Sequence, residues 1–392
     1  AKGDLTEVYK SLKLYLKSIR LNVPRVSPSF ERLARRFQQA ELEVYEAIVK
    51  RRQGISVDIP LITADGPSVD DVLKCWKRQK PASARNLKTC RSFEQVFEEF
   101  KGHCKAPTAR LIKKADAIAF RNALNARGDR KPKTIAKQLS FLRAAFQCAV
   151  NDDELESNPF AGVKVFVPEL ASSEKSRLPF TVSELKVIFE GPIYQVGFTP
   201  RKSLGLACRW LPLLALFTGA RLEELGQLDK ADVIQGHPSG AHICIRRAID
   251  KSQRTKNLNS VRNLPVHPTL VSLGFLDFVN SCSEGRIFPD LRPDKYGIHT
   301  TSFSTWFGSY LNDLGIVDKT RVFHSFRHSF IQRGKEKAAV VPPEVREAIV
   351  GHLTAKAIEM AYGSSLYPLE PQVEAMKHIS WPELDLAHLQ FE

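Results

Sequence analysis

Apolar residues recur at helical spacing through much of the chain. From residue 5 to residue 52 they fall three or four positions apart among Lys, Arg and Glu, which predicts two amphipathic helices separated by a segment with two prolines at 22–29. A further helical run begins after Ser68, an N-cap residue, and similar runs follow near 87–100, 115–126 and 133–151. Residues 1–65 are therefore expected to form a helical extension, and residues 66–167 a second, all-helical unit.

The pattern changes after residue 167. Residues 168–177 are polar and small, with a proline at their head, and predict a linker. Beyond it, Thr181 and Glu184 stand three residues apart, which is the capping-box signature of a new helix. The segments AHICIRRAIDKSQRT and SVRNLPVHP then predict two strands around a basic hairpin. Residues 178–392 are expected to form a mixed α+β unit with a small β-sheet.

Composition limits the classes of protein to consider. The chain has 392 residues, of which 43% are hydrophobic and 26% charged, and no apolar stretch is long enough to cross a bilayer. The first twenty residues carry charge throughout, unlike a secretory signal. The seven cysteines include no CxxC pair and no histidine partner at zinc-ligand spacing. We expect a cytoplasmic protein with reduced thiols, no membrane partner and no bound metal.

The net charge of +15 favours a polyanionic partner. Lys and Arg gain free energy when they displace the counterions that condense on nucleic acid. Basic loops of the second unit place Lys131, Lys133 and Lys137 around a predicted helix start, where backbone amides also favour phosphate. These lysines are predicted to contact the DNA backbone, although the solvated face of a small helical bundle would give the same pattern.

The segment LLALFTGARLEELGQL predicts a buried helix that runs into a glycine turn and releases Arg221, with Glu224 one helical turn later. A guanidinium stays charged, and its planar fork can hold two phosphate oxygens. The carboxylate of Glu224 could hold that fork in place. An ordinary ion pair on a helix surface explains the same two residues.

In VFHSFRHSFIQR, His324 and Arg327 are three residues apart and share a predicted helix face, whereas His328 is expected to point elsewhere. Arg327 could hold the second side of a phosphate. His324 could donate a hydrogen bond or shuttle a proton near neutral pH. Alone, such a pair is common by chance in a basic chain.

IVGHLTAKAIEMAYGSSLYP places His352 after a glycine turn and Tyr362 ten residues downstream. A phenol can attack a phosphodiester and form a covalent link that preserves the energy of the broken bond. It needs nearby positive charge because its ordinary pKa is about 10. Tyr367 has the same local chemistry, and in isolation a core aromatic explains Tyr362 better than a nucleophile does.

In this order, TGARLEEL, TKN at 255–257, VRNLPVH, HSFRH, GH and a tyrosine resemble the tyrosine recombinases, or phage-type integrases. The helical unit before them resembles that family's SAM-like core-binding domain. The resemblance implies a mainly α protein whose helical and catalytic domains form a C-shaped clamp on double-stranded DNA at a specific site. The matching catalytic positions are Arg221, Lys256, His324, Arg327, His352 and Tyr362, with Glu224 as the supporting acid.

The resemblance also implies a reaction. Tyr362 would form a 3′-phosphotyrosyl bond, Lys256 would act as general acid, and the freed 5′ hydroxyl would attack a partner strand without cofactor or metal. Exchange between two duplexes implies a homotetramer on DNA, with accessory DNA-bending factors as further partners. A type IB topoisomerase-like enzyme that nicks and religates one duplex, or an inactive DNA-binding member of the fold, would use similar residues.

Three points stay open within the resemblance. His352 and Tyr362 are ten residues apart, one more than the family's usual interval, which keeps Tyr367 as a second choice of nucleophile. Lys251 and Arg254 share the basic hairpin with the predicted general acid, and Arg254 is expected to contact DNA. The tail YPLEPQVEAMKHI could dock as a helix on a neighbouring subunit or pack on its own domain.

Overall fold

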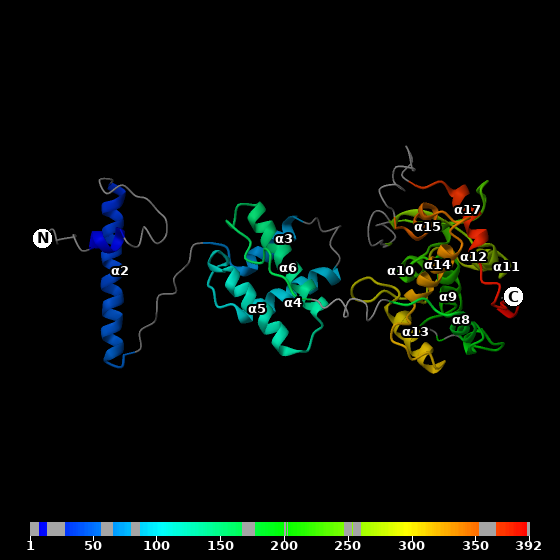
Figure 1. Cartoon of the computed structure of the whole chain (residues 1–392), viewed down its shortest axis with the longest axis horizontal. Coiled ribbons are helices and arrows are strands. Elements are labelled where there is room, and N and C mark those ends of the chain that lie inside the picture. The colour runs from blue at the N-terminus through cyan, green and yellow to red at the C-terminus, as the bar shows by residue number, and fades with distance from the viewer. Residues whose placement is uncertain are drawn as a thin grey trace.

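The computed structural model describes residues 8–13, 28–55, 66–79, 87–166, 177–199, 201, 203–246, 253, 260–352 and 366–389. Figure 1 shows their helices in groups that follow one another along the sequence. The described residues form three separate apolar cores. No helix among these residues is long and apolar enough to span a membrane. The predicted boundaries stay predictions. They divide the chain into an N-terminal extension (1–65), a helical unit (66–167), a linker (168–177) and a mixed α+β unit (178–392), called the catalytic unit below.

The N-terminal group consists of a helical segment at 8–13 and the long helix α2 (Pro28–Arg52). α2 begins on a proline, which suits the first turn of a helix because the missing N–H would have no partner there. Leu12 packs against Phe30 and Ala34 in a small core. Further along α2, Tyr45 is 67% exposed. Both halves of the predicted extension thus contain helix.

The second group contains the helices α3 (Val69–Gln79), α4 (Leu87–His103), α5 (Lys114–Arg127) and α6 (Pro132–Asn151) and the 3-10 turn η2 (Ala109–Leu111). At the start of α3 the amide of Ser68 donates to Asp71 at 3.1 Å, and the amide of Asp71 donates back to the Ser68 hydroxyl at 3.2 Å. Phe100 from α4 lies edge to face against Phe120 of α5 and against Phe160. The predicted helical unit is present.

The third group contains most of the elements. They are α8 (Val182–Phe189), η3 (Pro192–Tyr194), α9 (Ala207–Thr218), α10 (Leu222–Gly226), η4 (Lys230–Asp232), α11 (Pro268–Ser272), α12 (Phe275–Ser281), α13 (Thr301–Asp313), α14 (His324–Glu336), α15 (Pro343–Val350), α17 (Leu369–His378) and η6 (Ala387–Leu389). Every residue of α9 except Arg209 is buried. Because α10 and α14 pack against α9, this apolar helix is a central support of the unit.

A small antiparallel sheet completes the catalytic unit. Its strands are β1 (Val233–Ile234), β2 (His242–Ile245) and β3 (Arg262–Pro265), in the order β1-β2-β3. Ile243 pairs with Leu264, and both side chains are fully buried. The two predicted strands are therefore confirmed, with β1 as an addition. The predicted fold class, mainly α with a small sheet in the catalytic unit, is confirmed as well.

The C-terminal tail packs on its own domain in this structure. α17 contacts α15 and β3, and buries Leu369 and Met376. Beyond it, Trp381 stands edge to face against Phe217 of α9, with ring centroids 5.2 Å apart. The tail was predicted either to dock on a neighbouring subunit or to pack on its own domain, and in the single chain it packs on its own domain.

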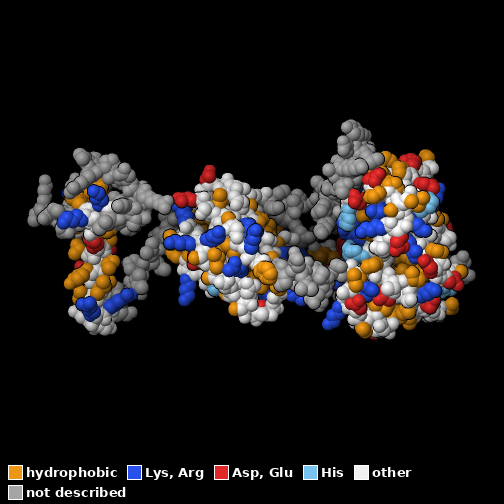
Figure 2. All heavy atoms as spheres, in the orientation of Figure 1, with side chains coloured by type: hydrophobic (Ala, Val, Ile, Leu, Met, Phe, Trp, Pro, Cys, Tyr) orange, Lys and Arg blue, Asp and Glu red, His pale blue; other side chains and the backbone are white. Residues whose placement is uncertain are grey.

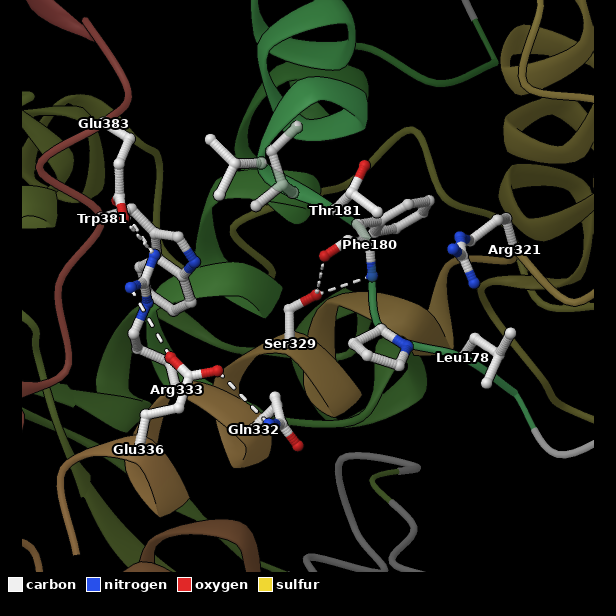
Figure 3. A pocket seen from close by; sticks show the side chains of 13 residues that line it. Leu178, Phe180, Thr181, Arg321, Ser329, Gln332, Arg333, Glu336, Trp381 and Glu383 are labelled. Atoms are coloured by element: carbon white, nitrogen blue, oxygen red, sulfur yellow. Dashed lines mark hydrogen bonds and ion pairs between the residues drawn. The ribbon is translucent and has the colours of Figure 1, made fainter.

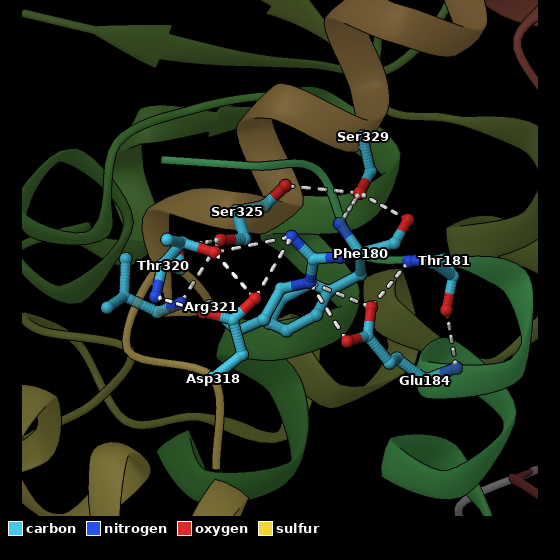
Figure 4. A network of polar contacts seen from close by, with 9 residues as sticks. Phe180, Thr181, Glu184, Asp318, Thr320, Arg321, Ser325 and Ser329 are labelled. Atoms are coloured by element: carbon cyan, nitrogen blue, oxygen red, sulfur yellow. Dashed lines mark hydrogen bonds and ion pairs between the residues drawn. The ribbon is translucent and has the colours of Figure 1, made fainter. Parts of the chain in front are cut away.

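The first residues of the catalytic unit are hydrogen-bonded to α14 and to the segment just before it (Figure 4). Thr181 and Glu184 form the predicted capping box of α8, and the Glu184 carboxylate also accepts from Nε of Arg321 at 2.9 Å. The amide of Phe180 donates to the hydroxyl of Ser329 on α14 at 2.9 Å. The segment that follows the predicted linker is thereby attached to the helix that carries the HSFRH motif.

Candidate active site

A left-handed turn between α9 and α10 positions Arg221. Gly219 ends α9 with φ 64°, a conformation that favours glycine, and a Cβ at this position would lie 2.6 Å from the ring of Phe330. Two residues later Arg221 is the N-cap of α10, and its amide donates to Oε2 of Glu224 at 2.9 Å. The turn therefore holds the Arg221 backbone while the side chain stays 22% exposed.

Glu224 is a buried carboxylate between two arginines. Its Oε1 accepts from Nη1 of Arg221 at 2.6 Å, and its Oε2 accepts from Nη2 of Arg262 at 3.0 Å. Burial favours the neutral acid, but the charges of Arg262 and Arg221 outweigh it and lower the pKa of Glu224 to about 2. The carboxylate is thus ionised at neutral pH and orients the Arg221 guanidinium.

Arg327 lies on α14 and is only 1% exposed. Its Nη1 donates to the carbonyl of Gly219 at 2.7 Å, and its Nη2 donates to the carbonyl of Val350 at 2.6 Å. The same Nη2 lies 2.9 Å from Nε2 of His352. Burial and the neighbouring arginines lower the pKa of Arg327 to about 9, so it remains charged at neutral pH. Arg327 connects the turn before Arg221 to the turn before His352.

His352 follows the left-handed end of α15 at Gly351, where φ is 69°. Because Arg327 can only donate, Nε2 of His352 accepts this hydrogen bond, and the proton of the neutral ring is assigned to Nδ1. Partial desolvation and the charges of Arg327 and Arg221 lower the pKa of His352. The exposed imidazole can therefore donate from Nδ1 to an incoming group.

His324 and His328 lie together near the start of α14. Their rings meet edge to face with centroids 5.0 Å apart, because residues four apart share a helix face. The expectation that His328 points elsewhere is wrong. Desolvation, His328 and the charges of Arg327 and Arg221 lower the pKa of His324 to about 4. The His324 side chain is exposed, so it is only partly desolvated, and the positive charges of Arg327 and Arg221 act with this partial desolvation to disfavour the protonated ring.

Several predicted site residues lie outside the described residues. They are Lys251, Arg254, Lys256 and Tyr362. Tyr367 is described: it packs against the catalytic core, and burial together with the charge of Glu344 raises its pKa. A phenol that packs on the core and ionises less readily is the poorer nucleophile. This packing argues against Tyr367 as the nucleophile, and the assignment of Tyr362 stays a prediction.

Arg262 belongs to the charge cluster, although the sequence did not point to it as a site residue. It is the first residue of β3, is 4% exposed, and its Nε donates to the carbonyl of Ile349 at 2.6 Å. The available signal was a basic residue at the head of a predicted strand, in VRNLPV. That pattern does not reveal its partners, because they come from α10 and α15.

The three lysines predicted to contact DNA lie at the N-terminal end of α6. Lys131 is the N-cap of this helix, and Lys131, Lys133 and Lys137 are all exposed. The ammonium of Lys137 lies 5.6 Å from the centre of the Phe141 ring. Figure 2 shows Lys and Arg side chains distributed over the visible face of the helical unit. The exposure and charge of this surface suit a phosphate backbone.

A cavity of about 450 Å³ lies elsewhere on the catalytic unit (Figure 3). It is lined by Leu178, Pro179, Phe180, Thr181, Val182, Leu185, Arg321, Ser329, Gln332, Arg333, Glu336, Trp381 and Glu383. Its α14 residues are Ser329, Gln332, Arg333 and Glu336, which helical periodicity places on the face away from Arg327. None of the predicted site residues lines it, so this cavity is separate from the charge cluster.

Among the described residues, one group has metal-ligand spacing: Cys75, Asp152 and Glu154, in the helical unit. Its members are bonded to one another and to neighbours. The Cys75 thiol donates to Asp152 at 3.2 Å, and Glu154 pairs with Arg78 at 2.6 Å. These contacts account for the group without an ion.

Known proteins resemble this chain in sequence and in fold. The "Tyrosine recombinase XerC-like" protein of Caldanaerobacter subterraneus subsp. tengcongensis is 22% identical over 346 residues, which cover 80% of this chain and 82% of that protein. No protein-family model matches.

Two solved structures share the fold. A Tn1549 transposon integrase in complex with circular intermediate DNA has a TM-score of 0.51 and 18% identity, over 76% of this chain and 95% of that one. A lambda integrase tetramer bound to a Holliday junction has a TM-score of 0.50 and 16% identity, over 80% and 88%. The chain thus has the integrase fold, and the resemblance found in its sequence motifs is confirmed.

Proposed function

We infer that the chain is a tyrosine recombinase, a site-specific enzyme that cuts and rejoins double-stranded DNA. One observation carries the proposal: Arg221, Arg327 and His352 come from three separate segments, yet one network of hydrogen bonds holds them around the Glu224 carboxylate and the Gly219 turn. Two guanidiniums and an imidazole in one place suit the charge that develops on a phosphodiester under attack.

In the proposed reaction the Tyr362 hydroxyl releases its proton to solvent and its oxygen attacks phosphorus. A bond forms between this oxygen and the phosphate, the bond to the 5′ oxygen breaks, and a 3′-phosphotyrosyl link results. Lys256 gives a proton to the departing 5′ oxygen. When a 5′ hydroxyl of a partner strand attacks the link, it returns its proton to Lys256, the tyrosine oxygen leaves and takes up a proton from solvent, and a new phosphodiester forms. The number of phosphoester bonds stays constant throughout, so neither step needs the energy of a nucleotide.

The structure supports distinct roles for the described side chains. Arg221, the partly exposed member of the arginine cluster, would hold the nonbridging oxygens, while the buried Arg327 would add positive charge and keep the turns before Arg221 and His352 in place. His324 and His352 would donate hydrogen bonds to the nonbridging oxygens. Both imidazoles have lowered pKa values in the free protein. The negative charge of bound DNA would raise these pKa values and make the histidines better donors when substrate is present.

The proposed partner is duplex DNA held in a C-shaped clamp between the helical and catalytic units, with Lys131, Lys133, Lys137 and Arg254 on its backbone. Strand exchange between two duplexes requires four active sites, so the active form would be a homotetramer. The lambda integrase neighbour is a tetramer on a Holliday junction. Accessory factors that bend DNA would assist assembly.

Nicked suicide duplexes taken from the DNA that flanks the gene test the proposal. Wild-type protein should form a covalent adduct that denaturing gels retain, Tyr362→Phe should abolish it, and Tyr367→Phe should retain it. If wild-type protein binds such DNA and never forms an adduct, this result contradicts the proposal that the chain is a DNA-cleaving enzyme. An adduct that survives Tyr362→Phe and disappears in Tyr367→Phe reverses the choice of nucleophile. Strand transfer between two labelled duplexes separates a recombinase from a topoisomerase-like enzyme.

A further inference from the structure

Arg262 makes an unusually complete set of contacts for an arginine that lies beside a proposed active site. It donates through Nη2 to Glu224 at 3.0 Å, through Nε to the carbonyl of Ile349 at 2.6 Å, and through Nη1 to the carbonyl of Ser260 at 2.9 Å. With 4% exposure, its guanidinium has no free surface from which to bind a DNA phosphate. Any effect on the reaction must pass through these partners.

The first partner sets the orientation of Arg221. Glu224 offers one carboxylate oxygen to each arginine, so Arg262 holds the carboxylate from the buried side while Arg221 meets it from the exposed side. Without Arg262, only Arg221 would remain to compensate the buried negative charge of Glu224. A carboxylate in such a place becomes easier to protonate, and a protonated Glu224 holds Arg221 less firmly.

The second partner is Ser260, which lies two residues before Arg262. Ser260 is the first described residue after 254–259, the stretch that contains the predicted general acid. Its carbonyl accepts from Arg262, and its hydroxyl lies 3.2 Å from Nη1 of Arg221. Ser260 is therefore hydrogen-bonded to both arginines.

The third partner is the turn that precedes His352. Arg262 bonds the carbonyl of Ile349, and its Nη1 would lie 3.1 Å from a Cβ on Gly351. The guanidinium therefore packs directly on the left-handed glycine that starts the turn. A change at Arg262 would disturb the backbone that places the His352 imidazole.

We propose that Arg262 is a positioning residue of this site: one buried guanidinium fixes the carboxylate that orients Arg221, the backbone at Ser260 and the turn before His352. The inference rests on the proposed cleavage reaction. It assigns Arg262 no contact with DNA and no proton transfer.

Single-turnover cleavage of the suicide duplex at saturating DNA tests the proposal. Arg262→Met should lower the cleavage rate about 100-fold, because a displacement of about 1 Å in the reacting groups can cost that much. DNA affinity should not change, since Arg262 is buried. Arg262→Lys should restore part of the rate, because an ammonium keeps a positive charge beside Glu224 without reaching all three partners.

A matched control comes from the same unit. Arg209 also donates to two backbone carbonyls, those of Ile193 at 2.6 Å and Gln195 at 3.1 Å, but lies on the N-terminal part of α9. Arg209→Met should cleave at the wild-type rate. A loss of cleavage that is equal in both Met variants would indicate general damage to the unit and overturn the specific role of Arg262.

The pH profile distinguishes positioning from a loss of folded protein. In Arg262→Met the pKa of Glu224 should rise, so the cleavage rate should begin to fall at a higher pH on the acid side than in wild type. Unfolding of part of the sample would instead reduce the amount of adduct at every pH. If Arg262→Met does not fold, the same comparison is made with Arg262→Lys.

The outcomes separate the two proposals. A wild-type protein that forms no adduct removes the proposed function, whatever the variants do. Suppose that wild-type protein forms the adduct, and that the folded Arg262 variants cleave at the wild-type rate and lose activity at the same acid pH. This result would overturn the role of Arg262 and leave the proposed function intact. Combining Arg262→Met with Glu224→Gln should cost less than the product of the two single losses, and independent effects would contradict action through Glu224.

Discussion

Around the buried carboxylate of Glu224 the positive charges are not equivalent. Arg262 and Arg327 are almost fully buried, while Arg221 keeps about a fifth of its side chain in solvent, 22% exposed. Carbonyl and carboxylate acceptors compensate the buried pair, because unpaired charges in the interior are costly. The charge that remains available to a ligand is therefore concentrated on the exposed side, at Arg221, and the adjoining neutral histidines can add hydrogen-bond donors.

Arg221→Ala should retain DNA binding and lose cleavage. Removing a donor that stabilises developing charge lowers the chemical rate about 100-fold or more, whereas binding depends on many phosphate contacts. Adduct formation and equilibrium binding on one suicide duplex measure the two effects separately.

Arg333→Ala is the control for this experiment. Arg333 pairs with Glu383 at 2.9 Å and lines the separate cavity of Figure 3. It should cleave like wild type. Intact cleavage by Arg221→Ala would exclude Arg221 from the site.

Helix ends place the proposed site residues. α9 ends at Gly219 and α15 ends at Gly351, both in the left-handed conformation, and the residues that follow deliver Arg221 and His352. The sequence indicated both glycine turns. Arg327 then joins the turns, because it donates to the carbonyls of Gly219 and Val350. The local sequence thus determines each turn, and hydrogen bonds from Arg327 on α14 hold the two turns together.

The C-terminal tail is attached to the sheet side of the unit by His267. This N-cap of α11 is 2% exposed, accepts from the amide of Thr269 through Nδ1 at 3.0 Å, and contacts the carbonyl of Ile379 through Nε2 at 2.8 Å. Nε2 therefore carries the proton of a neutral ring. Burial lowers the pKa of His267 to about 4, from an ordinary 6.5.

This shift predicts a dependence of stability on pH. The unfolded chain binds a proton at His267 more readily than the folded chain, so the stabilisation is complete above about pH 6.5 and is lost as the pH falls toward 4. At pH 5 the loss should be about 2 kcal/mol from this residue. Urea unfolding at pH 7 and pH 5 should show a smaller loss in His267→Gln than in wild type. Equal losses in the two proteins would contradict the assignment.

At the scale of the molecule, the helical and catalytic units each have a large core of their own, and the small N-terminal core is separate. The predicted DNA-backbone lysines belong to the helical unit, whereas the arginine cluster belongs to the catalytic unit. Binding and chemistry should therefore respond to different substitutions.

Replacing Lys131, Lys133 and Lys137 together with Gln should weaken DNA binding and leave the cleavage rate at saturating DNA unchanged. Each lost phosphate contact reduces the slope of log K against log salt by about 0.9 on duplex DNA, so three contacts reduce it by about 2.7. Binding measured over a salt series gives this slope.

A charge-matched control uses three lysines of the same unit that already pair with carboxylates: Lys74, Lys77 and Lys101. Their replacement removes the same net charge and should change the slope less. If both triple variants behave alike, the α6 lysines make no specific backbone contact.

The sequence by itself determined the local elements and the kind of chemistry. Helical spacing, the capping box at Thr181 and the two strands on either side of the basic segment depend on neighbouring residues, and the structure confirms them. The ordered motifs identified the recombinase resemblance, since each motif is local even though their set spans the catalytic unit.

Only the tertiary structure decided which of these pieces meet. Helical spacing could have predicted the T-shaped contact of His328 with His324. It could not predict that Glu224 and Ile349 bind Arg262, because they lie 38 and 87 residues away in the sequence. The tail likewise had two alternatives until the packing of α17 on β3 was known. Long-range contacts depend on how whole elements pack, and no local pattern of side chains specifies that packing.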